Sequence, residues 1–319
     1  MDNLTHSLVG ALIGQAGLKR KTGLGMPALI FGANLPDLDA GCVVYGLENL
    51  AMRRGLTHGP IAWVVLPLLL AAFIWWFDRW QARRGTRPDD RLPVRFGWLY
   101  VLSFIGCLSH PALDWLNSYG IRLLEPFSSR WFYGDALFIV DVWIWVVAIA
   151  TLTISQRREK QGRAKWNRPA LVGLVAILAY INANLIITAT AEAAAPQRDA
   201  IAVPVPLAFW ERDLIVDTDG PIYTGYALQR WSLAGGTQPP QMLVDQPACL
   251  HPLQLTQFAP NNRELAAFLF WSRAPYIERQ ERDGQVIDVL RDARFTGSAG
   301  SRFQVPVPVP AEAENCLQE

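Results

Sequence analysis

Histidines and aspartates near the ends of apolar segments are the residues of this sequence that could do chemistry. Three of the chain's four histidines, His6, His58 and His110, lie in its first third. Each has a carboxylate or a small polar residue close by in the sequence. His110 and Asp114 are four residues apart, so on a helix their side chains would share one face. Such a pair can bind a metal ion, or the aspartate can orient the histidine.

Two further aspartates follow an apolar segment in the stretch from Asn34 to Asp39. Pro36 disfavours helix at the residue before it, so Asp37 and Asp39 would stand where a helix ends. Two carboxylates this close repel each other unless a cation or a proton lies between them. Taken alone, the pattern also fits a helix end followed by a solvated turn, and the histidine–aspartate pair also fits a buried structural contact.

Together these groups form a nitrogen and oxygen ligand set that suits zinc, with manganese and iron as alternatives. Such an ion lowers the pKa of bound water and polarises a carbonyl or phosphoryl oxygen, so hydrolysis becomes feasible near neutral pH. We expect four residues as metal ligands, namely Asp37, Asp39, His58 and His110. His6 and Asp114 would be further metal ligands or partners that orient the ligands, and Asp39 and Asp114 are the candidate catalytic carboxylates.

Three arginines near these groups could bind an anionic substrate, because a guanidinium matches the geometry of a phosphate. They are Arg53, Arg54 and Arg130. Contact with lipid headgroups is the alternative role for them. Asp135 and Asp141 could extend the site, although a structural pairing inside a helical bundle suits Asp141 equally well.

Apolar segments must position these groups, and their lengths indicate helices in a membrane. A helix needs about 20 apolar residues to cross a hydrocarbon core of about 30 Å. Four segments come near that length: Gly59 to Phe77, Phe96 to Leu113, Ala136 to Ser155 and Pro169 to Thr190. Leu4 to Leu18 and Gly25 to Leu35 are shorter and would either cross inside the bundle or re-enter it. We therefore expect a polytopic α-helical membrane bundle with four clear spans and two short N-terminal hydrophobic helices.

Basic loops set the expected orientation of this bundle. Residues 78–95 hold six arginines, residues 157–168 hold six arginines and lysines, and residues 114–135 hold only two arginines. By the positive-inside rule, the two basic loops are cytoplasmic. His58, His110 and Asp114 then lie at the outer face, joined by the N-terminal candidates if the short segments span. Arg53 and Arg54 would also lie outside, against the rule.

Composition indicates a membrane part joined to a water-soluble part. Hydrophobic residues make up 51% of the chain and charged residues 18%, yet the mean hydropathy of +0.15 is low for a chain wholly inside a membrane. A net charge of +1 gives no reason to propose nucleic acid as a partner. The N-terminus lacks the basic region of a cleavable signal peptide, so we expect the first hydrophobic segment to remain in the mature protein.

The sequence changes character near Pro196, and the remainder resembles β structure. Val203 to Pro206 would be an extended linker, and Ala266 to Trp271 a strand. Asp-Gly is a strong hairpin signal, and it occurs at residues 219–220 and again at residues 283–284, inside an expected hairpin from Tyr276 to Leu290. We expect a membrane domain over residues 1–192 and a small β-rich extracytoplasmic domain over residues 196–319.

Two details of this C-terminal region remain open from the sequence. Cys249 and Cys316 could pair in an oxidising compartment, but spacing alone does not decide this. The alternating valine–proline tail from Val305 would be extended or disordered.

The motifs resemble those of a known family, the YdjM-like, LexA-regulated inner-membrane proteins of bacteria. The shared blocks occur in order over about residues 1–155: Thr5-His6, Leu35 to Asp39, Arg54 to His58, Ser109-His110 with Asp114, Asn117 to Gly120, Leu124 to Phe127 and Arg130-Trp131. The resemblance implies an integral protein of the bacterial inner membrane with a metal-dependent hydrolase activity. Gly59-Pro60 stands where relatives often have a serine, which leaves the ligand role of His58 intact but can change a neighbouring hydrogen bond.

Two functions of different classes fit these observations. The first is a membrane-bound metal-dependent hydrolase that cleaves a phosphoester or lipid-like substrate at the outer face with a metal-activated water. Its partner would be a lipid or another small anionic molecule. The second is a non-catalytic membrane protein whose histidine–aspartate cluster is structural and whose C-terminal domain binds a partner. A transporter is a third class, but the sequence shows no matching halves with broken helices to support it.

Overall fold

The chain divides into two compact units, each described here by itself. The computed structural model describes residues 1–195, 197, 199–218, 226–243, 252–282, 285–296 and 303–307. The helical unit comprises Met1–Asp39, Arg54–Ile186 and Pro206–Phe209. The mixed unit comprises Ala40–Arg53, Ile187–Val205 and the chain from Trp210 onward.

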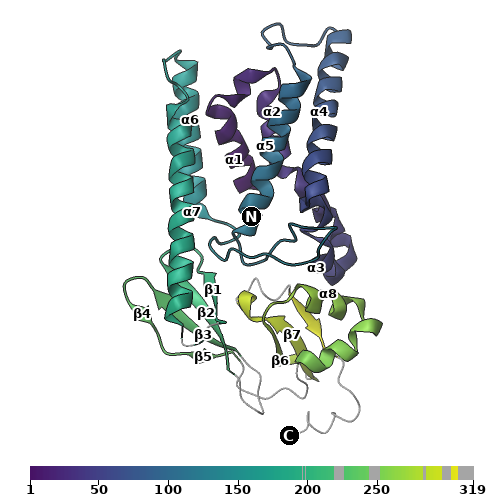
Figure 1. The fold of residues 1–319 in the computed structure, drawn as a ribbon, viewed down its shortest axis with the longest axis vertical. Helices are drawn as coiled ribbons and strands as arrows, with labels where there is room; N and C mark the ends of the chain where they lie inside the picture. The colour runs from purple at the N-terminus through teal and green to yellow at the C-terminus, as the bar shows by residue number, and fades with distance from the viewer. Residues whose placement is uncertain are drawn as a thin grey trace. The chain divides into compact units, whose positions relative to one another are not determined.

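The helical unit is built from six α-helices, with the short helices α1 and α2 beside α5 (Figure 1). In chain order its elements are α1 (Asn3–Gln15), η1 (Leu18–Lys21), α2 (Gly25–Asn34), η3 (Leu56–His58), α4 (Pro60–Arg83), α5 (Phe96–Trp115), α6 (Val142–Lys160) and α7 (Arg168–Ala194). The 3-10 segment η2 (Leu35–Glu48) begins in this unit, and α7 leads out of it. Asp2 caps α1 by accepting a hydrogen bond from the Thr5 amide at 3.0 Å.

Three helices of the described chain, α4, α5 and α7, are long and apolar enough to cross a membrane. They correspond to three of the four expected spans. The fourth, expected from Ala136 to Ser155, is not confirmed. Its helix α6 begins only at Val142, because the Asp141 side chain caps it by accepting from the Trp143 and Ile144 amides. The helix then runs into the charged residues 157–160, which shortens its apolar part.

Glycines bring α1, α2 and α5 into backbone contact. A Cβ atom placed on Gly106 of α5 would lie 2.5 Å from the carbonyl oxygen of Leu29 in α2. A Cβ atom on Gly32 of α2 would lie 2.6 Å from the carbonyl oxygen of Ser103 in α5. Small residues allow such close approach between helices in membranes. The contact fixes the end of α2 against the part of α5 that carries the candidate site.

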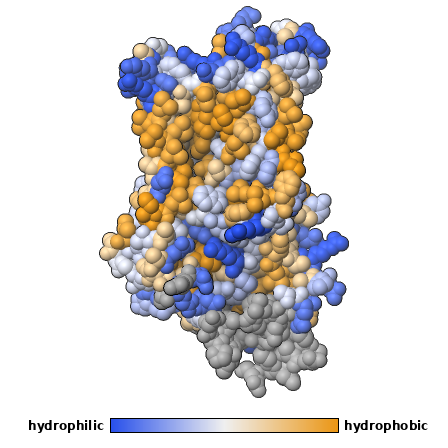
Figure 2. Space-filling model, in the orientation of Figure 1, coloured by the Kyte–Doolittle hydropathy of each residue, from blue (hydrophilic) through white to orange (hydrophobic). Residues whose placement is uncertain are grey.

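The basic segments gather at the opposite end of the helical unit. Lys19 and Arg20 of η1 pair with Glu159 of α6 at 2.6 and 3.2 Å. The Arg95 amide, before α5, donates to the Thr22 hydroxyl at 2.8 Å. Hydrophobic residues cover the unit in a broad belt, and hydrophilic residues gather at the end with the basic loops (Figure 2).

The mixed unit contains two antiparallel sheets. Strands β1 (Ile201–Pro204), β2 (Glu211–Asp217), β3 (Tyr226–Ser232) and β4 (Gly236–Thr237) pair in that order, and β5 (Gln241–Met242) pairs with β3. The second sheet has the order β6 (Pro275–Arg282), β7 (Gln285–Asp292) and β8 (Gln304–Pro306). From residue 252 onward, the mixed unit also contains the helical elements η4 (Pro252–Gln257), η5 (Ala259–Asn261), α8 (Arg263–Trp271) and η6 (Ala293–Phe295). The expected β-rich character of this region is confirmed.

Local expectations for this region had mixed outcomes. The hairpin expected from Tyr276 to Leu290 is confirmed, since β6 and β7 pair antiparallel. The strand expected from Ala266 to Trp271 is wrong, because these residues belong to α8, which Asn262 caps by accepting from the Leu265 amide. The expected linker at Val203 is part of β1. Both Asp-Gly pairs, Cys249 and Cys316 lie outside the described residues.

Residues 40–53 are an excursion of the chain into the mixed unit. They include the second part of η2 and α3 (Asn49–Met52), which packs on α8. The residues that flank the excursion, Asp39 and Arg54, both belong to the helical unit. They meet there, because the Arg54 amide donates to the Asp39 carboxylate at 2.8 Å.

Candidate metal centre

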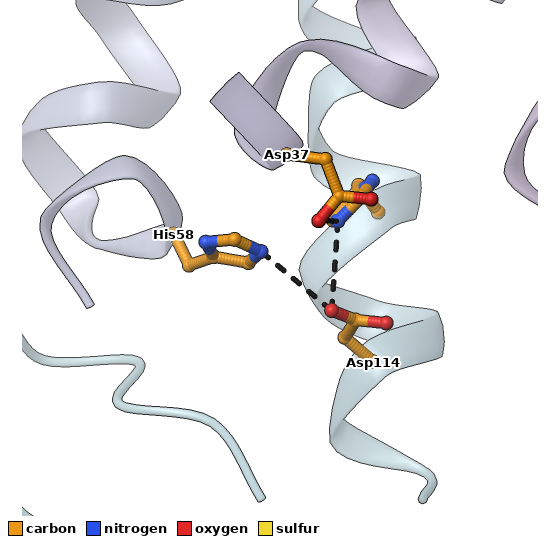
Figure 3. A group of neighbouring side chains, drawn as sticks. Asp37, His58 and Asp114 are labelled. Carbon is orange, nitrogen blue, oxygen red and sulfur yellow. Dashed lines mark ion pairs between the residues drawn. The ribbon is translucent and has the colours of Figure 1, made fainter. Parts of the chain in front are cut away.

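Four side chains from three segments converge at one end of the helical unit. Asp37 comes from η2, His58 from η3 at the start of α4, and His110 and Asp114 from the last turns of α5. One potential ligand atom from each residue lies within 4.8 Å of all the others. Figure 3 shows how the His58 ring and the Asp37 carboxylate point toward the Asp114 carboxylate.

The spacing of these atoms matches a small coordination sphere. Nε2 of His58 lies 3.6 Å from Oδ2 of Asp114, and Nε2 of His110 lies 3.5 Å from the same oxygen. Nε2 of His110 is also 3.6 Å from Oδ1 of Asp37. In a tetrahedral zinc site with bonds near 2.1 Å, neighbouring ligand atoms are about 3.4 Å apart. The observed separations are slightly larger than this value.

Two of the converging atoms, Nε2 of His58 and Nε2 of His110, are buried without a hydrogen-bond partner among the described residues. Both face Oδ2 of Asp114, which lies 3.0 Å from Nε of Arg54. All three side chains are at most 1% exposed. Buried polar atoms are normally hydrogen-bonded, so two such nitrogen atoms beside one carboxylate oxygen call for a ligand. The donor set therefore fits a metal ion.

The other ring nitrogens are held so that these Nε2 atoms can act as ligands. Nδ1 of His110 lies 2.7 Å from the carbonyl oxygen of Ala33 at the end of α2. A carbonyl only accepts, so Nδ1 carries the proton and Nε2 keeps a free lone pair. Nδ1 of His58 lies 2.9 Å from the Thr57 hydroxyl and 3.4 Å from the Asp39 carboxylate. Asp39 thus contacts the side of the His58 ring opposite Nε2.

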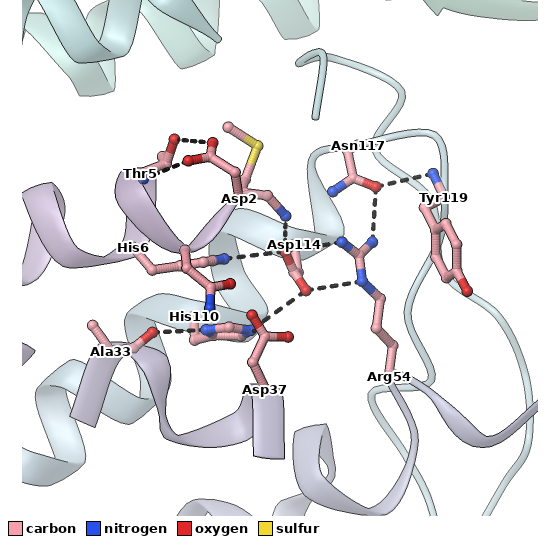
Figure 4. A network of polar contacts seen from close by, with 12 residues as sticks. Asp2, Thr5, His6, Ala33, Asp37, Arg54, His110, Asp114, Asn117 and Tyr119 are labelled. Atoms are coloured by element: carbon pink, nitrogen blue, oxygen red, sulfur yellow. Dashed lines mark hydrogen bonds and ion pairs between the residues drawn. The ribbon is translucent and has the colours of Figure 1, made fainter. Parts of the chain in front are cut away.

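Arg54 and Asp114 form the electrostatic centre of the cluster (Figure 4). The guanidinium Nε lies 3.0 Å from one Asp114 oxygen, and Nη2 lies 3.3 Å from the other. Its Nη1 donates to Asn117 Oδ1 at 2.9 Å and to the Gly120 carbonyl at 3.2 Å. The Met1 amino group also pairs with Asp114. A buried carboxylate that is paired with a guanidinium and an amino group remains ionised, as a metal ligand must be.

Of the other expected site residues, His6 contacts the cluster, whereas Arg53, Arg130 and Asp141 have other surroundings. His6 stacks on His110 with ring centroids 3.7 Å apart, and its Nε2 lies 3.3 Å from Asp114. Arg130 is exposed, with its guanidinium over the ring of Phe132. Arg53 belongs to the mixed unit. Asp141 caps α6 and accepts from the Tyr180 hydroxyl at 3.0 Å, which is a structural pairing.

Two polar residues of the site had no role assigned from the sequence. Thr57 donates to the Asp39 carboxylate at 2.8 Å and contacts His58. Asn117 accepts from Arg54 and from the Tyr119 amide at 2.9 Å each. Their positions beside His58 and three residues after Asp114 were the available signals, but only the folded loops show which partners they meet.

The two aspartates of η2 are poised as anions. Burial would raise the pKa of Asp37, but pairing with His110 outweighs it and lowers the pKa to about 2. Burial would likewise raise the pKa of Asp39, and the contacts with His58, Thr57 and the Arg54 amide lower it below its usual value. Both carboxylates are therefore charged at neutral pH and suited to a cation.

Comparisons with known proteins place this site within a matched region. A family model described as YdjM inner membrane protein matches residues 1–191, which include every residue of the cluster. The uncharacterized protein YfhP of Bacillus subtilis (strain 168) is 28% identical over 166 residues, or 48% of this chain and 46% of that protein. The chain thus matches about half the length of this curated relative. No solved structure matches the chain.

Proposed function

The chain belongs to the YdjM inner membrane protein family, and from this membership we propose that the helical unit is a membrane-bound metal-dependent hydrolase. The ion would be held by Asp37, His58, His110 and Asp114. One observation carries the proposal, namely that the buried Nε2 atoms of His58 and His110, which have no hydrogen bond, both lie 3.5 to 3.6 Å from Oδ2 of Asp114. Two imidazoles and two carboxylates suit zinc, with manganese or iron as alternatives.

Each residue has a distinct task in this proposal. A bound ion would lower the pKa of water and polarise a phosphoryl or carbonyl oxygen of the substrate. The Ala33 carbonyl and the Asp39 carboxylate orient the rings of His110 and His58. Arg54 balances the charge of Asp114. Asp37 is the least buried of the four ligands, so water and substrate would enter from its side.

The site would face the extracytoplasmic side of the inner membrane. The basic loops 84–95 and 161–167 follow α4 and α6, while the cluster lies at the other end of α5. Loops rich in lysine and arginine stay in the cytoplasm. The chain that follows α7 would then also be extracytoplasmic. A phosphoester or lipid-like molecule at this surface is the substrate class that we propose.

Metal content tests this proposal directly. The detergent-purified parent protein would be compared with His58→Ala and His110→Ala by inductively coupled plasma mass spectrometry. His251→Ala is the matched control, since it changes the one histidine of the sequence that is not among the expected ligands. We expect a near-stoichiometric ion in the parent and control and its loss in both site variants. A parent that takes up no ion after incubation with zinc or manganese would refute the proposal.

A structural role for the cluster is the second candidate, and one observation favours it. Asp114 already pairs with Arg54, His6 and the Met1 amino group, so much of its charge is balanced by protein groups. In that case the site variants would lower the melting temperature in the same way with and without added zinc. The C-terminal domain would then carry the function by binding a partner.

A further inference from the structure

An apolar groove on the helical unit begins beside the candidate metal centre. It has a volume of about 240 Å³ and is lined by Leu56, Thr57, Ile61, Ala62, Val65 and Leu66. Most of these residues lie on the first two turns of α4, a helix apolar and long enough to span the membrane. Ile61 is 52% exposed and Val65 is 43% exposed, so protein side chains leave much of this surface uncovered. In the proposed orientation, lipid chains would surround it.

Thr57 links the groove to the metal centre. Its side chain lines the groove, and its hydroxyl lies 2.8 Å from the Asp39 carboxylate and 2.9 Å from Nδ1 of His58. The groove therefore has one polar end, one residue away from a candidate ligand. A molecule with a long apolar chain in the groove would bring its head beside the His58 ring, at the edge of the cluster.

Two exposed apolar residues stand next to site residues in the chain. Leu56, at the polar end of the groove, is 64% exposed. Leu38 is also 64% exposed and stands between the two site aspartates, Asp37 and Asp39. Exposed leucines beside charged ligands are compatible with contact with a membrane or an apolar ligand, which contiguous apolar patches mark on protein surfaces. The rim of the site is thus suited to a substrate that stays in the bilayer.

We propose that the substrate is a membrane lipid with an anionic phosphate head, with one acyl chain in the α4 groove and the phosphate at the cluster. This rests on the proposed metal-dependent function and specifies its substrate class. The phosphate follows from the site, because its hard oxygen atoms are good ligands for a divalent cation. Any lipid chain can fill the groove, so the net negative charge of the phosphate head is what separates the substrate from a zwitterionic bulk lipid such as phosphatidylcholine.

Photolabelling in vesicles tests this proposal without requiring turnover. The zinc-loaded full chain would be reconstituted in dioleoyl-phosphatidylcholine vesicles containing a small fraction of a photoreactive lipid. Two probes would carry the same diazirine acyl chain, one on phosphatidic acid and the other on phosphatidylcholine. We expect phosphatidic acid to label the peptide from Leu56 to Leu66 several-fold more than phosphatidylcholine does. This excess should vanish in His58→Ala, which lacks the ion.

Two neighbouring valines provide matched variants. Val65→Trp fills the groove, whereas Val64→Trp places the same ring on the same helix outside it, at a residue that is 53% exposed. We expect Val65→Trp to lose the excess labelling and Val64→Trp to keep it, with zinc bound in both. Ile61→Trp is a second groove-filling variant if Val65→Trp does not fold.

The outcomes separate this proposal from the one on which it rests. Equal labelling by the two probes in a parent that holds zinc would overturn the lipid proposal and leave the metal centre standing. Excess labelling that survives in Val65→Trp or Ile61→Trp would also overturn it, since the chain would then lie elsewhere. A parent that takes up no ion would instead refute the metal-dependent function.

Discussion

At the scale of single residues, Arg54 determines the charge balance of the cluster. Its side chain is 6% exposed and forms two contacts with Asp114, one with Asn117 and one with a backbone carbonyl. From the sequence we expected Arg54 to bind an anionic substrate or to contact lipid headgroups. In the folded chain its donors are already engaged by protein groups, so its main effect is to hold Asp114.

Replacing Arg54 should therefore affect stability before it affects substrate binding. Arg54→Leu leaves a buried carboxylate with less compensation, which typically costs about 3–5 kcal/mol of unfolding free energy. Arg54→Lys keeps the positive charge beside Asp114 and should therefore recover part of this stability. The recovery should be incomplete, because an ammonium group cannot make the forked contact of a guanidinium. Unfolding in one detergent, with the exposed Arg130→Leu as control, measures both. A stable Arg54→Lys protein with a raised KM would instead show that Arg54 binds substrate.

Asp39 provides a second test at this scale, because it contacts His58 on the side away from Nε2. Removing such a partner usually weakens metal binding by about 10–100-fold. We expect this loss for Asp39→Asn in a zinc titration against a chelator. Asp78→Asn is the control, since Asp78 is similarly buried but pairs with Arg91 at the basic end. Complete loss of zinc in Asp39→Asn would indicate that Asp39 is itself a ligand.

At the scale of secondary-structure elements, the contact between α2 and α5 positions the ligands. The end of α2 supplies the carbonyl that holds His110, and Asp37 follows within one turn. This arrangement depends on Gly106, where α5 meets the backbone of α2. A substitution that separates α2 from α5 should therefore displace the ligands and weaken metal binding.

Gly106→Ala should separate the two helices and lower metal content. The added Cβ would lie 2.5 Å from one backbone atom of α2 and 3.0 Å from another, so a helix must move. Gly97→Ala is a close control, because it lies in the same helix and its Cβ would meet nothing within 4 Å. We expect a reduced melting temperature and reduced zinc in the first variant and neither in the second. Equal melting temperatures and equal zinc contents in Gly106→Ala and Gly97→Ala would show that the contact between α2 and α5 tolerates an added methyl group.

Some of these elements could be predicted from the sequence, and others could not. Histidines and aspartates at the ends of apolar segments were informative, because such groups are costly near a membrane and tend to be functional. Short apolar runs do not distinguish a strand from a helix, and the run from Ala266 to Trp271 fits both. Asn262 was the missed signal there, as a side chain that caps α8. At α6, the Asp141 cap delays the helix past the start of the apolar run.

At the scale of the whole molecule, the orientation in the membrane remains a prediction. In a cysteine-free background, Thr86→Cys marks the basic loop after α4 and Gln238→Cys marks the mixed unit, and both positions are exposed. A membrane-impermeant maleimide added to spheroplasts should label Gln238→Cys and leave Thr86→Cys unlabelled until the cells are lysed. Labelling of Thr86→Cys alone in intact spheroplasts would reverse the proposed orientation.

The excursion of residues 40–53 determines how the protein can be taken apart. Because α3 packs on α8 while Asp39 and Arg54 stay with the helical unit, the two units are not consecutive along the chain. A truncation after α7 would remove α8, on which α3 packs. The unpaired α3 would then remain in the chain between the site residues Asp39 and Arg54. Exchange of domains between relatives would therefore have to transfer residues 40–53 together with Ile187–Val205 and the chain from Trp210 onward, so that segments far apart in the sequence would be inherited together.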